Sequence, residues 1–185
     1  MEEKRVRSKC RLFIFKIESL MKASKKSGVV LAVDPLMYTP LDDNWVNAGT
    51  LQRQLLDMKA LHASGYGEKE LAGSGADFYE RYKPYINDGK TIKAAPHKMY
   101  GPESNDLVYQ LRSHGIDTVI LGDLVANLCV DSHMRVLMEN GFRVYVVKDA
   151  VAAPGDDAYN AAVTNYGMIA NGVLTTEQAV KAIGG

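Results

Sequence analysis

Residues 118–149 constrain the fold of this 185-residue chain more than any other stretch. They open with an apolar run at 119–121 and close with another at 144–147, and each run predicts a buried strand of a parallel sheet. Between the runs lies a helical pattern that ends at Asn140-Gly141, a common helix-stop signal. A strand, a helix and a second strand form the crossover unit that parallel neighbours require.

The alternation of strands and helices extends along the chain. Apolar runs predict further strands at 12–15, 29–33, 91–94 and 172–174. Apolar residues at helical spacing predict helices at 16–27, 50–62, 76–85, 103–114, 156–170 and 176–183. This order predicts an α/β fold with a doubly wound parallel sheet that helices cover on both faces. We expect one domain, residues 1–185, with an atypical leader at 1–15.

Composition narrows the functional classes. Lys and Arg together number 22, as do Asp and Glu, so the formal net charge is zero and favours neither nucleic acid nor a membrane surface. No apolar run approaches the roughly 18 residues of a membrane span. We therefore expect a cytoplasmic protein without nucleic-acid or membrane partners. The two cysteines, Cys10 and Cys129, do not make a disulfide framework, so both are expected as thiols.

Cys129 is the candidate nucleophile of the chain. It falls where the helix after the 119–121 strand begins, at the carboxyl edge of the predicted sheet, where ligands of open parallel sheets bind. Unpaired backbone N–H groups and the helix dipole favour a thiolate at such a place. Lys98, which follows the 91–94 strand, would lie on the same edge and stabilise the anion. The alternatives are a buried structural cysteine and an exposed surface lysine.

Neighbouring residues are candidates for a binding pocket. The backbone N–H groups of residues 124–129 lie before and at the helix start, where they would hold an oxyanion. Asn127 is expected either to cap the helix or to bind substrate, and capping is favoured. His133 is one helical turn beyond Cys129 and faces either the pocket or the core. Tyr100 belongs to a group of loop aromatics that either line a pocket or pack as lids and subunit contacts.

Two long stretches resemble the isochorismatase-like cysteine hydrolases, a superfamily that includes nicotinamidases and N-carbamoylsarcosine amidases. They are residues 97–121, HKMYGPESNDLVYQLRSHGIDTVIL, and residues 126–153, ANLCVDSHMRVLMENGFRVYVVKDAVAA. The resemblance implies a Rossmann-like fold, a homo-oligomer, and hydrolysis of an amide C–N bond in a small molecule through a thioester. It also implies a Cys-Lys-Asp triad with Cys129 and Lys98, and an oxyanion hole formed by the backbone N–H groups of Cys129 and Val125, next to a cis peptide bond.

Metal binding is not expected. Nicotinamidases of this superfamily use a cluster of aspartate and histidine after the second strand, where this chain has Asp42 and Asp43 but no histidine. The histidines of the chain have no ligand spacing; they are His62, His97, His114 and His133. We predict no zinc site and no cofactor.

The chain departs from that family in the third member of the triad. The family's aspartate ends its first strand, and residues 1–15 hold no aspartate. Asp34 fits the local pattern, but the resemblance implies that the segments on either side of 29–33 are those of the family's second strand. We therefore do not expect Asp34 to be the base. Asp123 stands where the family tends to have glycine. Without a base, turnover should fall by about 10²–10⁴-fold. The alternative is therefore a catalytically impaired member, a pseudoenzyme that serves as a binding or assembly protein.

Overall fold

All described strands pair in parallel. The longer sheet has the order β3-β4-β5, and the shorter sheet pairs β1 with β2. The strand bounds are β1 Ala32–Val33, β2 Ile92–Lys93, β3 Thr118–Leu124, β4 Arg143–Ala152 and β5 Gly172–Leu174. The computed structural model describes residues 2–36, 44–57, 68–74, 76–95 and 100–184.

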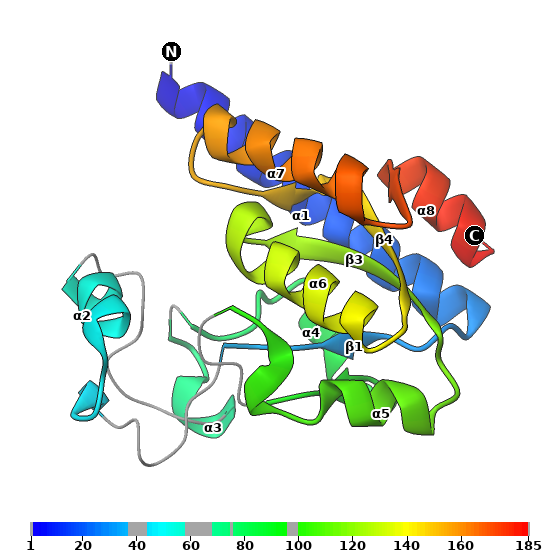
Figure 1. The fold of residues 1–185 in the computed structure, drawn as a ribbon, viewed down its shortest axis with the longest axis horizontal. Helices are drawn as coiled ribbons and strands as arrows, with labels where there is room; N and C mark the ends of the chain where they lie inside the picture. The colour runs from blue at the N-terminus through cyan, green and yellow to red at the C-terminus, as the bar shows by residue number, and fades with distance from the viewer. Residues whose placement is uncertain (1, 37–43, 58–67, 75, 96–99, 185) are drawn as a thin grey trace.

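Helices cover both faces of the strands (Figure 1). The main helices are α1 Glu2–Ser27, α4 Lys83–Ile86, α5 Leu107–Ser113, α6 Asp131–Glu139, α7 Asp156–Ile169 and α8 Thr176–Ile183. On one face α1 and α8 pack against β4 around buried Ile17, Val147 and Ala179. On the other face α6 and α7 pack around buried Met134 and Tyr166. This arrangement confirms the predicted α/β fold, a parallel sheet structure with helices on both sides.

Shorter helical segments complete the described part of the chain. They are α2 Thr50–Asp57, α3 Glu68–Leu71, the 3₁₀ turn η2 Pro102–Ser104 and the π-helical turn η3 Ala126–Val130. The helix predicted at 76–85 is wrong, because helix begins only at Lys83 and Pro84 occupies its first turn. Before it, the carboxylate of Asp77 accepts from the N–H of Gly73 at 2.7 Å and stabilises a turn instead. No described helix combines the length and apolar character that crossing a bilayer requires.

The amino-terminal segment is helical rather than extended. The strand predicted at 12–15 is wrong, because α1 runs through these residues without a break. Phe13, Ile17 and Met21 stand four residues apart, so they share one face of the helix and pack into the cluster around Val147. Burial of this face outweighs the aromatic and β-branched content that favoured a strand locally.

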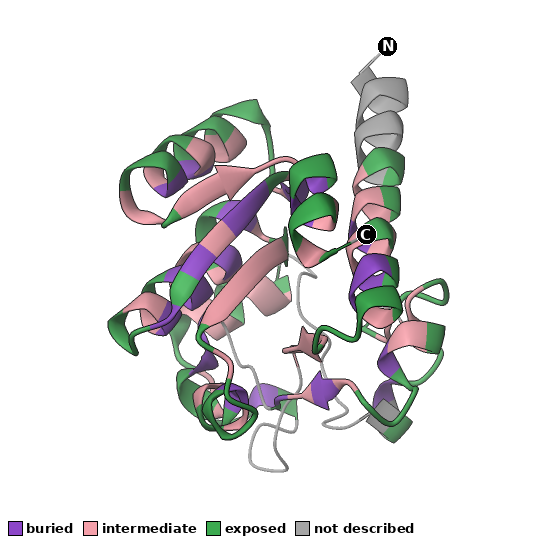
Figure 2. Cartoon of the chain, turned by 90° about the vertical axis from the view of Figure 1, so that its right-hand side faces the viewer, coloured by how far each residue is buried: buried purple, intermediate pink, exposed green. Residues whose placement is uncertain are grey.

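The strand predicted at 29–33 is shorter and less buried than expected. Only its last two residues form β1, and Val29 and Val30 are 48% and 39% exposed. By contrast, the valines near the start of β4 are completely buried, and Figure 2 shows this difference along the strands. The reason is the number of neighbours, because β4 lies between two strands while β1 pairs with β2 alone among the described residues.

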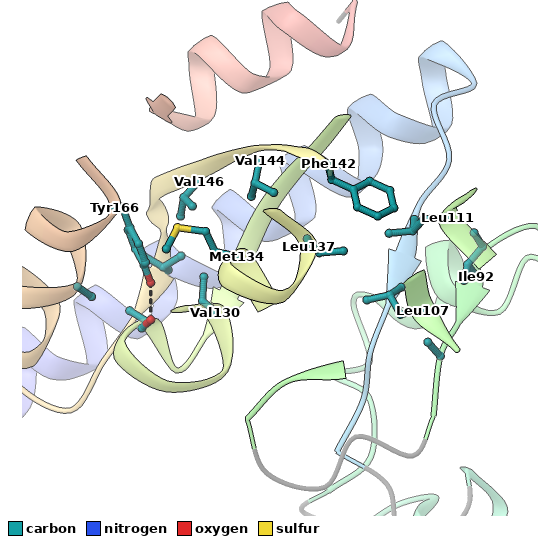
Figure 3. Close-up of a cluster of buried hydrophobic side chains, with 14 residues drawn as sticks. Ile92, Leu107, Leu111, Val130, Met134, Leu137, Phe142, Val144, Val146 and Tyr166 are labelled. Atoms are coloured by element: carbon teal, nitrogen blue, oxygen red, sulfur yellow. Dashed lines mark hydrogen bonds between the residues drawn. The ribbon is translucent and has the colours of Figure 1, made fainter. Parts of the chain in front are cut away.

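The helix predicted before Asn140 is confirmed. α6 ends at Glu139, and Gly141 has a φ of +80°, in the left-handed region that glycine adopts at low cost. Figure 3 shows the buried cluster that α6 covers, with Met134 at its centre. Within this cluster the hydroxyl of Tyr166 donates a hydrogen bond to the backbone carbonyl of Ala126. This bond ties α7 to the first residue of η3.

The last helix begins with a complete capping box, which allows a test of its contribution. Oγ1 of Thr175 accepts from the N–H of Gln178 at 3.3 Å, and Oε1 of Gln178 accepts from the N–H of Thr175 at 2.8 Å. We expect Thr175→Ala to lower the free energy of unfolding by about 1 kcal/mol in urea denaturation. Thr175→Ser keeps the hydroxyl and should stay close to the wild type. An equal loss in both variants would contradict the capping role.

Candidate active site

The thiol of Cys129 lies at the carboxyl edge of the longer sheet. β3 ends at Leu124, and after one residue the chain enters η3, which continues directly into α6. Cys129 belongs to η3, is half-buried, and takes part in no disulfide. The structure therefore places Cys129 where the sequence predicted it, at the start of the helical run after β3. Its role as a nucleophile stays a prediction.

The turn before Cys129 has an unusual backbone. The peptide bond between Leu124 and Val125 is cis, at the position where the resemblance implied one. Asp123 has a φ of +128°, in a region that residues other than glycine rarely adopt. The carbonyl of Val125 accepts two hydrogen bonds from N–H groups of η3, at 3.0 and 3.2 Å. These bonds hold the turn against η3, while the oxyanion-hole role of the N–H groups of Val125 and Cys129 stays a prediction.

His133 connects the two sheets. Its Nε2 lies 2.7 Å from Oδ2 of Asp34, and its Nδ1 lies 2.8 Å from the backbone carbonyl oxygen of Cys129. Both side chains of the pair are buried, each with 8% of its surface exposed. His133 belongs to α6 and Asp34 directly follows β1. The pair therefore links the carboxyl end of β1 to the helix that follows β3, and it holds the backbone of Cys129.

The partners of His133 determine its charge. A carbonyl oxygen cannot donate, so Nδ1 must carry a hydrogen to bond to the carbonyl oxygen of Cys129. A carboxylate also only accepts, so the bond to Asp34 needs a second hydrogen on Nε2. These two contacts favour the imidazolium form of the ring. Burial by itself would lower the pKa of His133, but the hydrogen bonds to Asp34 and to the carbonyl of Cys129 outweigh burial and raise this pKa.

Asp34 has a second partner, Asn105, which the sequence did not indicate. Nδ2 of Asn105 donates to Oδ1 of Asp34 at 2.8 Å, and Oδ1 of Asn105 accepts from the N–H of Leu107 at 2.9 Å, where α5 begins. Asn105 and His133 are 71 and 99 positions away from Asp34. No helical or strand period connects residues so far apart, so the sequence holds no signal for these contacts.

Asp123 places a second carboxyl group near the carboxyl end of β3, before Cys129. The residue is exposed, but the dense protein around its carboxyl raises the pKa of Asp123 to about 6. The N–H of Leu124, which donates to its Oδ1 at 2.9 Å, and the positive charge of His133 oppose this rise. A carboxyl group with a pKa near neutral is able to exchange a proton under physiological conditions.

The remaining predicted site residues differ in how they are placed. Asn127 is exposed, and η3 begins after Val125 without any side-chain cap, so the favoured capping role of Asn127 is wrong. Tyr100 is half-buried, and its backbone contributes to the raised pKa of His133. Lys98 lies outside the described residues. Within the ranges that the structure describes, no three His, Cys, Asp or Glu side chains gather as they would around a metal ion.

Sequence comparisons identify relatives of the chain. A family model described as "Isochorismatase domain" matches residues 13–178. Among curated proteins, the chain is 33% identical over 98 residues to an uncharacterised isochorismatase family protein, YecD, of Escherichia coli O157:H7. The alignment covers 52% of this chain and 50% of that relative. The chain therefore spans about half the length of the curated relative.

Solved structures share the fold. A cysteine hydrolase from Pseudomonas syringae pv. phaseolicola has a TM-score of 0.76 at 17% identity, over 93% of this chain and 80% of that one. The N-carbamoylsarcosine amidase from Thermoplasma acidophilum has a TM-score of 0.68 at 19% identity, over 92% of this chain and 86% of that one. At these identities the likeness shows a common fold and does not identify a substrate.

Proposed function

The chain belongs to the isochorismatase family, and from this premise we propose that it hydrolyses an amide C–N bond of a small molecule through a thioester on Cys129. The observation that carries the proposal is the half-buried thiol in η3, at the carboxyl edge of β3. Ligands of open parallel sheets bind at that edge, and helix starts there favour negative charge. The proposal includes a cytoplasmic homo-oligomer without a cofactor.

The proposed reaction has two stages. The thiolate of Cys129 attacks the amide carbonyl carbon, so a C–S bond forms and the carbonyl oxygen becomes an oxyanion. The backbone N–H groups of Val125 and Cys129 would stabilise this oxyanion. Its collapse breaks the C–N bond, and the leaving amine takes up the proton that the thiol gave up. Water then attacks the thioester, which releases the acid and returns the thiol.

A catalytically impaired family member is the second candidate, and the contacts of Asp34 favour it. A triad needs a carboxylate that accepts the proton of the thiol. Both carboxylate oxygens of Asp34 accept hydrogen bonds, from His133 and Asn105. In this alternative Asp34 is a positioning residue that holds His133 and Asn105 in place. A protein of this kind would bind a small molecule or an assembly partner without turnover.

Ammonia release tests the proposed function, with nicotinamide, N-carbamoylsarcosine and a panel of short primary amides as probes. We expect Cys129→Ala to lower the turnover of an accepted probe by about 10³-fold or more, because no other group would form the thioester. Cys10→Ala changes the other cysteine of the chain and should keep turnover within about twofold.

Intact-protein mass spectrometry distinguishes the two candidates. An acyl adduct that forms on Cys129 and is then released supports the hydrolase. An adduct that forms and persists supports the impaired member, because attack has occurred without deacylation. Turnover that survives in the Cys129→Ala variant would overturn the proposed function.

A further inference from the structure

The two sheets form one layer of the molecule, although no ladder joins them. Leu31 and Val33 pack into the same apolar cluster as Ile120 of β3, on the face covered by α1. Ala32 packs into the cluster on the opposite face, as does Val119 of β3. The side chains of both strands thus alternate between the same two faces, as in neighbouring strands of one sheet. Both strands also run from right to left in Figure 1, so they point the same way.

The backbone hydrogen bonds of β1 show which of its edges is occupied. The carbonyls of Leu31 and Val33 accept from two N–H groups of the β2 segment, at 2.9 and 3.0 Å. The backbone groups of alternate residues in a strand point to opposite edges. The N–H and C=O groups of Val30 and Ala32 therefore point away from β2.

The same argument applies to β3. The carbonyl of Asp117 accepts from the N–H of Arg143 at 2.8 Å, so the backbone of Asp117 points toward β4. By alternation the backbone groups of Val119 also point toward β4, and those of Thr118 and Ile120 point to the opposite edge. Within the described part of the chain, β3 has β4 as its one strand neighbour.

We call Val30, Ala32, Thr118 and Ile120 the open edges. Val30 is 39% exposed and the other three are half-buried, so solvent reaches all four residues. No described strand pairs with the open edges. Backbone N–H and C=O groups of folded proteins are nearly always paired, and an unpaired row of them is a template for another strand.

We propose that the open edges bind an extended apolar segment of a partner polypeptide, which enters as a strand between β1 and β3, parallel to both. Because the strands on its two sides point the same way, the segment would form hydrogen bonds along both of its edges. Apolar clusters lie on both faces of the layer, so successive side chains of the segment are apolar rather than alternately polar. The length of the open edges suits a segment of about five residues.

The surroundings of the open edges define how the segment enters. At the carboxyl end the contact between Asp34 and His133, 2.7 Å long, fixes β1 relative to the helix after β3. At the amino end of β1, Val29 and Val30 are exposed apolar residues. An apolar segment would cover these two side chains as it pairs with the open edges, which would join the two sheets into one.

A labelled peptide tests the proposal on the full chain. The probe has five central residues, alternately valine and isoleucine, between pairs of lysines, with fluorescein at its amino terminus. We expect saturable binding in fluorescence anisotropy. A control peptide with the same side chains carries N-methyl groups on its central amides. Its affinity should be lower by at least about tenfold, because each N-methyl group removes a hydrogen-bond donor. Equal binding of both peptides would overturn strand pairing.

Two variants of one open-edge residue localise the binding. Ala32→Pro removes the N–H that points away from β2 and should weaken peptide binding by about tenfold. Ala32→Val has a similar size and keeps the N–H, so its affinity should stay within about threefold of the wild type. Equal affinities of the two variants would place the peptide elsewhere and overturn the proposal.

Hydrogen exchange of the wild-type chain gives a readout that needs no variant. We expect the amides of Ala32 and Ile120 to exchange rapidly in the chain alone and to slow by about tenfold or more with the peptide bound. Slow exchange in the chain alone would mean that another part of this chain already pairs with the open edges. That result, or the lack of saturable binding, would overturn the proposal.

Discussion

Replacing Asp34 by alanine is expected to lower the free energy of unfolding by about 3–5 kcal/mol, as loss of one partner of a buried ion pair does. The change leaves the imidazolium of His133 buried without its counter-charge. It also removes the acceptor of the Nδ2 hydrogen bond of Asn105. Urea denaturation at about pH 6, where His133 is charged, measures the loss.

The same variant should change how stability depends on pH. The pKa of His133 is raised in the folded chain above its ordinary value of 6.5, so the folded state binds this proton more tightly than the unfolded state. The resulting stabilisation is fully present below about pH 6.5 and is lost as the pH rises through the raised pKa. The wild type should therefore lose stability in that window, and Asp34→Ala should lose much less.

Asp34→Asn is the matched control for this experiment. Asparagine keeps the size of the side chain and an oxygen that accepts from His133, but it removes the charge. We expect a smaller loss of stability than in Asp34→Ala, together with the same flattened pH dependence. A wild type and an Asp34→Asn variant with equal pH slopes would show that His133 and Asp34 are not a charged pair.

The fold around Cys129 could be predicted because local and tertiary signals agree there. The apolar run at 119–121, the helix stop at Gly141 and the apolar run at 144–147 each favour the element that the structure shows. In the amino-terminal segment the signals conflict. Residues 12–15 favour a strand by composition, and the four-residue spacing of Phe13 and Ile17 favours the helix that forms.

The site could be predicted only in part, and the reason is sequence distance. Cys129 was predictable because its position follows from the strand before it and the helix after it. The contact between Asp34 and His133 depends on how β1 and α6 come together, which no local pattern encodes. The strand order likewise decides that Ala32 and Ile120 lie on open edges, because the apolar runs alone favour buried strands.

Replacing Asp123 by glycine is expected to raise the free energy of unfolding by about 1–2 kcal/mol. A residue with a side chain at a φ of +128° is strained, and such strain costs about 1–3 kcal/mol. Glycine adopts this φ without strain, although its greater freedom in the unfolded chain offsets about 0.5–1 kcal/mol of the gain. The change also removes a carboxyl group that the folded chain holds in an unfavourable environment. Thermal and urea denaturation at about pH 7 measure the gain.

The pH dependence separates the charge of Asp123 from its backbone strain. Burial raises the pKa of Asp123 to about 6, so the folded state binds this proton more tightly, and the wild type loses stability as the pH rises from about 4 to about 6. Because the residue as a whole is exposed to solvent, the loss is smaller than the shift alone would give. Asp123→Asn removes the charge and keeps the strained backbone, so it should flatten this dependence but gain less stability than Asp123→Gly. Equal gains of stability in Asp123→Gly and Asp123→Asn would exclude backbone strain as a contribution. A loss of stability in Asp123→Gly would show that the hydrogen bond from the N–H of Leu124 outweighs the strain.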